Sequence, residues 1–136
     1  MHDYDAFSTW IGRDTPKARK GTSRRAPEGL RFAFYGRAST VEHQDPATSE
    51  GWQREAAEHL VAGHGRIVAS YFDVGSSRRL PWRHRPQAAE LLAALADSDR
   101  GFDAIVVGEY ERAFAADQFQ RMASLFRRHD IQIWLP

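Results

Sequence analysis

Apolar residues along the chain fall into short β-type runs separated by stretches with helical spacing. The runs are rich in β-branched and aromatic residues and predict strands at 30–35, 66–72, 104–107 and 131–135. The run 104–107 contains no polar residue, as is typical of a strand buried in a parallel sheet. Because strands and helices alternate, the sequence predicts an α/β fold, a three-layer sandwich around a mostly parallel sheet.

Amphipathic helices are expected between those strands. Thr48 or Ser49 is the expected N-cap of the first helix. Pro86 suits the first turn of the second helix, and Asp117 suits the cap of the third. A long polar loop, 73–85, precedes the second helix. The predicted inward face of the first helix consists of Trp52, Ala56, Leu60 and Val61.

The first 29 residues differ from the rest of the chain. They contain few apolar residues and many charged or turn-forming ones, and their basic residues are Arg13, Lys17, Arg19, Lys20, Arg24 and Arg25. We therefore expect a flexible basic arm at 1–29, followed by one globular domain at 30–136.

The amino-acid composition excludes several kinds of site and several classes of protein. The chain has no cysteine, which excludes disulfides, thiolate metal sites and cysteine nucleophiles and fits a reducing cytoplasm. No apolar run approaches the roughly 18 residues of a membrane span. The net charge is only +1, but arginines cluster in the loop 73–85. That cluster, Arg78, Arg79, Arg83 and Arg85, is suited to a phosphate backbone or, alternatively, forms a solvated loop.

Polar residues follow three of the predicted strands. Ligand sites of open α/β sheets lie beyond the carboxyl ends of the strands, so the three loops are expected on one rim. They carry Arg37 and Ser39, then Asp73 and Arg85, then Glu109, Glu111 and Arg112. A serine with several arginines and carboxylates suits chemistry on a phosphodiester. The chain lacks a Walker loop, a dinucleotide-binding G-x-G-x-x-G after the first strand and a G-x-S-x-G elbow.

These residues resemble the motifs of a known family. The stretch Tyr35-Gly36-Arg37-Ala38-Ser39-Thr40, followed by Gln44 and Gln53, resembles the opening motif of the serine recombinases. The resemblance continues through 73–77, Arg85-Pro86, 102–107 and Glu111-Arg112, and it covers 30–136. It implies a resolvase-like catalytic domain.

The resemblance also implies a mechanism. Ser39 would attack a DNA phosphodiester and form a 5′-phosphoserine link, which conserves the bond energy for rejoining without any cofactor or metal. Its partners would be DNA and further copies of the chain, as dimers that join into tetramers. By the same resemblance, Arg37, Arg85 and Arg112 would hold the phosphate, Asp73 and Glu111 would position arginines or handle protons, and Gln44 and Gln53 would support the nucleophile loop. Arg78, Arg79 and Arg83 are the expected contacts to the rest of the DNA.

Simpler roles exist for several of these residues. Arg85 could pair with a carboxylate, and Asp73 could cap the turn at Gly75. Glu111 could pair with Arg112. Trp82 could stack on a base or, more commonly, pack on its own domain.

Two departures from the family pattern favour a second hypothesis. The family's third motif usually carries a second arginine where this chain has Ala115, and Arg78, Arg79 or Arg83 is a candidate substitute. The family's usual long helix and DNA-binding domain are also missing, as in a fragment, a truncated product or a free-standing domain. The alternative is therefore a catalytically degenerate recombinase-fold module that binds DNA or other subunits. An unrelated phosphate-binding α/β domain is a third hypothesis.

Overall fold

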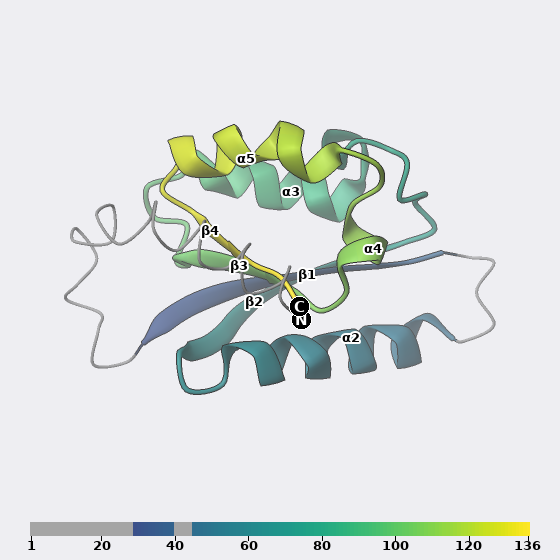
Figure 1. Cartoon of the computed structure of the whole chain (residues 1–136), viewed down its shortest axis with the longest axis horizontal. Coiled ribbons are helices and arrows are strands. Elements are labelled where there is room, and N and C mark those ends of the chain that lie inside the picture. The colour runs from purple at the N-terminus through teal and green to yellow at the C-terminus, as the bar shows by residue number, and fades with distance from the viewer. Residues whose placement is uncertain (1–28, 40–44) are drawn as a thin grey trace.

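The computed structural model describes residues 29–39 and 45–136 (Figure 1). Residues 1–28 of the predicted N-terminal arm and Gln44 lie outside the described residues. The chain order is β1 (Leu30–Ala38), α2 (Pro46–Val61), β2 (Gly65–Val74), the 3₁₀ turn η2 (Trp82–His84), α3 (Pro86–Leu95), β3 (Ala104–Val107), α4 (Tyr110–Ala113), α5 (Gln118–Arg128) and β4 (Gln132–Trp134). None of the described helices is long and apolar enough to cross a membrane.

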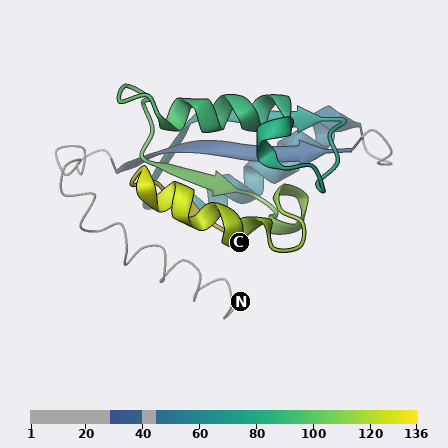
Figure 2. The same ribbon diagram turned by 90° about the horizontal axis from the view of Figure 1, so that it is seen from above.

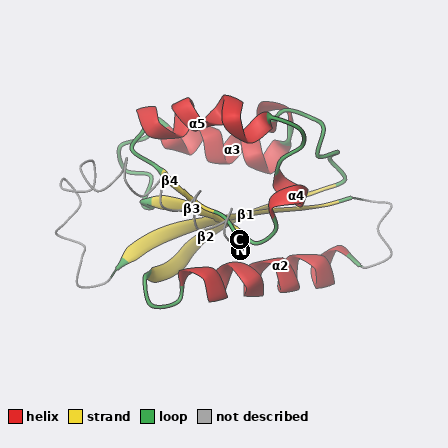
Figure 3. Cartoon of the chain, in the orientation of Figure 1, coloured by secondary structure: helices red, strands yellow, loops and turns green. Residues whose placement is uncertain are grey.

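The described strands form one parallel sheet in the order β2-β1-β3-β4, with β1 at its centre (Figure 3). Helix α2 covers one face, and α3 and α5 cover the other (Figure 1). Viewed from above, α3 and α5 lie on opposite sides of β1, with α3 packed against β2 and α5 against β4 (Figure 2). The predicted three-layer α/β fold around a parallel sheet is therefore confirmed.

The alternation of side chains along β1 divides the core into two layers. Phe32 and Phe34 join the cluster under α2, whereas Ala33 and Tyr35 join the larger cluster under α3 and α5. All four side chains are fully buried. Both faces of the central strand are thus apolar, as a strand between two helical layers requires.

Strand β1 is longer than predicted. It continues through Gly36, Arg37 and Ala38, which lie opposite Phe72, Asp73 and Val74 of β2. Arg37 and Asp73 are therefore strand residues rather than loop residues. Parallel pairing extends the strand past the apolar run that ends at Tyr35, which an apolar pattern alone cannot reveal.

Helix α2 also departs from the prediction. It starts at Pro46, and Asp45 is the N-cap, accepting a bond from Thr48 N at 3.3 Å. Its buried residues are Ser49, Gln53, Ala57 and Val61, while Trp52, Ala56 and Leu60 are only half-buried. The prediction was right for Val61 and wrong for the rest of the buried face, because Gln53, although polar, is the residue that bonds to β1.

Two glycines let α2 lie close to the carboxyl ends of the strands. A Cβ atom on Gly108, just after β3, would lie 2.0 Å from the Gln53 carbonyl oxygen. A Cβ atom on Gly36 would lie 2.8 Å from Gln53 Oε1. At Gly108, where the contact is with the helix backbone, any larger residue would push the helix away from this edge of the sheet.

Candidate active site

Ser39, the predicted nucleophile, follows β1 directly at the carboxyl edge of the sheet and is half-buried. The strand end before it is held on both sides. Gln53 Oε1 accepts from Arg37 N at 3.3 Å, and Gln53 Nε2 donates to Arg37 O at 3.0 Å. On the other side, Gly75 N donates to Ala38 O at 2.9 Å. These bonds fix the direction in which the chain leaves the sheet at Ser39.

Arg37 connects the loops that follow β2 and β3. Its guanidinium donates to Ser76 O at 2.6 Å and to Arg112 O at 2.8 Å. The residue is only 6% exposed, which distinguishes it from a solvated surface arginine. The rim of three loops predicted from the sequence thus forms around Arg37.

Arg112 lies on the single-turn helix α4 and is half-buried. Its Nε atom donates to Glu109 Oε1 at 2.6 Å, and its guanidinium lies 5.4 Å from the ring centre of Trp52. Glu111 is exposed, and its carbonyl oxygen accepts a bond from Arg78. The carboxylate that orients Arg112 is therefore Glu109, for which the sequence analysis predicted no separate role, rather than Glu111.

Arg85 is fully buried, and its guanidinium donates hydrogen bonds to acceptors inside the protein. A guanidinium has five N–H groups. The acceptors and distances are Arg78 O at 2.6 Å, Ala113 O at 2.8 Å, Leu80 O at 3.0 Å, Gln118 Oε1 at 3.2 Å and Tyr35 Oη at 3.3 Å. Five acceptors match five donors, so this geometry leaves no N–H group of Arg85 for a phosphate.

Asp73 connects Arg85 to helix α3 through Tyr35. Tyr35 Oη donates to Asp73 Oδ2 at 2.8 Å. The same carboxylate accepts from Gln87 N at 2.7 Å and from Ala88 N at 3.0 Å, so it caps α3 from β2. Asp73 does not simply cap the turn at Gly75, since these three donors occupy its carboxylate. Burial raises the pKa of Tyr35 above its ordinary value, against the opposing effect of Arg85, so the phenol stays protonated and can donate.

Gln118, at the start of α5, is a residue that sequence reasoning missed. Its Oε1 atom accepts from Arg85 and from Ala115 N at 2.9 Å, and its Nε2 atom donates to Arg78 O at 3.1 Å. A glutamine in a first helical turn gives no signal of such a role, because Arg78 and Arg85 belong to a distant loop.

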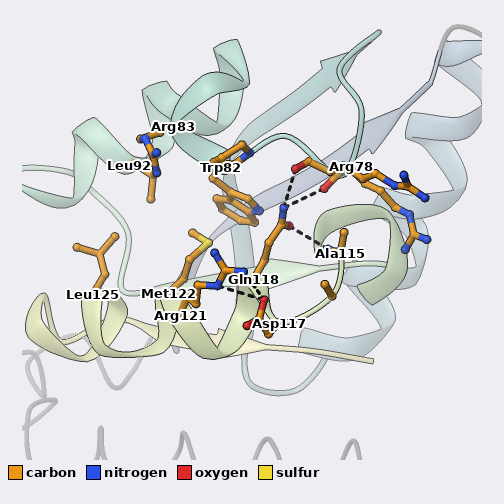
Figure 4. Close-up of a pocket in the computed structure, with 13 residues that line it drawn as sticks. Arg78, Trp82, Arg83, Leu92, Ala115, Asp117, Gln118, Arg121, Met122 and Leu125 are labelled. Atoms are coloured by element: carbon orange, nitrogen blue, oxygen red, sulfur yellow. Dashed lines mark hydrogen bonds and ion pairs between the residues drawn. The ribbon is translucent and has the colours of Figure 1, made fainter.

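The exposed arginines of the loop after β2 surround a cavity. Arg78, Arg79 and Arg83 line it together with Ala115, and its volume is about 740 Å³ (Figure 4). Trp82 is 2% exposed and packs against Tyr35 and Phe114, whose ring centres are 4.4 and 5.1 Å from its own. The tryptophan therefore packs on its own domain, and stacking on a base is ruled out in this conformation.

Known structures share this architecture. The N-terminal catalytic domain of TP901-1 integrase superposes with a TM-score of 0.63 at 21% identity, over 76% of this chain and 75% of that one. The C-terminal catalytic domain of ISC1926 TnpA, an IS607-like serine recombinase, superposes with a TM-score of 0.62 at 17% identity, over 78% of this chain and 69% of that one. No protein-family model and no curated protein sequence matches the chain. The chain thus has the fold of serine recombinase catalytic domains, as its motifs predicted.

The cap supplied by Asp73 yields a stability prediction. In Asp73→Asn only one side-chain oxygen remains to accept the three hydrogen bonds that the carboxylate accepts from two backbone amides and the Tyr35 hydroxyl. We therefore expect the free energy of unfolding to fall by about 2–3 kcal/mol. The matched control is Asp45→Asn at the exposed cap of α2, where asparagine caps as well as aspartate and the change is at most a few tenths of a kcal/mol. Urea unfolding monitored by circular dichroism measures both. Equal losses in the two variants would refute the role of Asp73.

Proposed function

We propose that this chain is a catalytic domain for DNA strand cleavage and rejoining by a serine nucleophile. One observation carries the proposal. In a fold shared with serine recombinase domains, a serine follows the central strand beside Arg37, and Arg37 is bonded to the loops after β2 and β3. Open α/β sheets bind their ligands at this edge.

The proposed reaction is an exchange of phosphate esters. The Ser39 hydroxyl oxygen attacks the phosphorus of a DNA phosphodiester, and its proton passes to a rim carboxylate or to solvent. The bond from phosphorus to the 3′ oxygen breaks, and the leaving oxygen takes a proton from a rim residue or from solvent, which gives a 3′ hydroxyl and a phosphoserine at the 5′ end. A hydroxyl from another strand end reverses the step, so one ester is exchanged for another and no external energy is needed.

The rim supplies the positive charge that this reaction needs. Arg112, which Glu109 orients, is the best-placed candidate to neutralise the phosphate, because its side chain remains partly exposed. Arg37, two residues before Ser39, is proposed to add positive charge near the attacked phosphate as well as to hold the two loops. We assign Asp73 and Arg85 to positioning, through Tyr35 and the loop carbonyls, and Gln53 to support of the nucleophile strand. Exposed Arg78, Arg79 and Arg83 are proposed to contact neighbouring DNA phosphates in an oligomeric complex.

Covalent trapping tests the nucleophile. The chain, fused to a sequence-specific DNA-binding module, is incubated with suicide DNA substrates, and adducts are read on denaturing gels. We expect adduct from the wild type and at least about a thousandfold less from Ser39→Ala, because the attacking oxygen is gone. Ser77→Ala, which removes an exposed hydroxyl from the next loop, is the matched control and keeps its adduct. If Ser39→Ala still forms adduct, the nucleophile assignment is wrong.

A second candidate function is a degenerate module that binds DNA without cutting it. Two observations favour it. Ala115 stands where the family pattern has an arginine, and the donors of Arg85 are occupied inside the protein. An arginine at the scissile phosphate contributes several kcal/mol to a transition state, so a site with fewer of them can lose its turnover.

Restoring the arginine separates the two candidates. Ala115 borders the cavity described above, so an arginine side chain has room there. If the wild type cuts slowly, Ala115→Arg is expected to raise the rate of adduct formation about tenfold or more. Ala93→Arg, on the exposed side of α3, is the control and leaves the rate unchanged. Single-turnover kinetics on the same suicide substrates measure the rates. If neither the wild type nor Ala115→Arg forms adduct, the degenerate function is supported.

A further inference from the structure

The cavity beside Ala115 has an aliphatic floor. Leu92 of α3 and Met122 and Leu125 of α5 line it, and all three are half-buried. Figure 4 shows Leu92 and Arg83 across the cavity from Met122 and Leu125. A volume of about 740 Å³ lies within the usual range for ligand pockets. The proposed cleavage chemistry makes no use of these apolar side chains.

The rim of the cavity carries excess positive charge. Arg78, Arg79 and Arg83 form no ion pair with any carboxylate among the described residues, whereas Arg121 pairs with Asp117 at 2.6 Å. Three uncompensated guanidinium groups therefore face a partner with negative charge. That partner must also present apolar groups, because the floor is aliphatic.

Nucleic acid fits this combination poorly. A stacked base needs an exposed aromatic face, but Trp82 is only 2% exposed and its ring packs against Tyr35 and Phe114. Duplex phosphates could reach the arginines, but they would leave the floor unused. A peptide with aliphatic side chains flanked by carboxylates complements both parts of the cavity.

We propose that this cavity binds a short acidic, amphipathic peptide segment of a partner protein. Its aliphatic side chains enter the groove between α3 and α5, and its carboxylates pair with Arg78, Arg79 and Arg83. This is the helix-in-groove mode of recognition, in which a methionine adapts the floor to its ligand. Because the same arginines are proposed to contact DNA, the peptide and DNA compete for the domain.

A display library of short random peptides provides the test. The whole chain is immobilised, and heparin is added to suppress binding by charge alone. We expect enrichment of peptides that combine Leu, Ile or Met with Asp or Glu. Affinities of an enriched peptide and of a DNA oligonucleotide are then measured separately by fluorescence anisotropy.

Variants of the floor and the rim distinguish the two ligands. Met122→Gln combined with Leu125→Gln is expected to weaken the peptide at least about tenfold and to leave oligonucleotide affinity unchanged. Arg83→Glu is expected to weaken both ligands, as is Arg79→Glu. Leu60→Gln, at a half-buried leucine on the opposite face, is the matched control and changes neither. If the floor variant fails to fold, as judged by circular dichroism, the two exposed arginine variants still test the pairing with carboxylates.

Several results would overturn the proposal. The library could enrich no peptides, or only basic ones, and either result would contradict it. So would an enriched peptide whose affinity changes in neither the floor variant nor the arginine variants. Equal loss of oligonucleotide binding in the floor variant would assign the cavity to DNA instead. Self-association of the chain that the floor variant abolishes would make a second copy the occupant. Since oligonucleotide affinity and adduct formation are separate readouts, failure of this proposal is distinguishable from failure of the proposed cleavage.

Discussion

The buried guanidinium of Arg85 constrains the arrangement of the whole rim. Removing a charged group from water costs several kcal/mol unless its donors are satisfied inside the protein. Arg85 meets that condition with acceptors from β1, the loop after β2, the end of α4 and the start of α5. These segments are far apart in the sequence, so they must converge on one point. If one acceptor moved away, a buried donor would be left without a partner.

The geometry of the candidate site follows from that convergence. The carbonyl groups of Arg78 and Leu80 face inward to Arg85, which leaves the side chain of Arg78 on the surface. Ala113 at the end of α4 is held in the same way, and α4 carries Arg112. On the other face of the sheet, Gln53 fixes the strand that leads to Ser39. The strand that leads to Ser39 and the arginine-bearing loops are thus held from two sides, and preorganisation of this kind would suit the proposed phosphate transfer.

The sequence predicted the strands and helices better than it predicted the roles of the side chains. Apolar periodicity located the strands and helices, because burial in a layered fold leaves that signal in the sequence. It missed the end of β1, since Gly36 and Arg37 are held by backbone pairing and not by apolar contacts. The family resemblance implied that Arg85 holds a phosphate, because an arginine in a polar loop looks solvated until its acceptors are known. The roles of Glu109 and Gln118 were missed for the same reason, because their partners are set by tertiary structure.

The most direct test of the role of Arg85 is amide hydrogen exchange in Arg85→Lys compared with Arg83→Lys. A lysine cannot supply five donors in one plane. We expect the amides of Leu80, Ala115 and Gln118 to exchange at least about tenfold faster in Arg85→Lys, while β1 and β3 keep their protection. The exposed substitution Arg83→Lys should change none of them. If these amides keep their protection in Arg85→Lys, or if the whole domain exchanges together, Arg85 does not organise the rim.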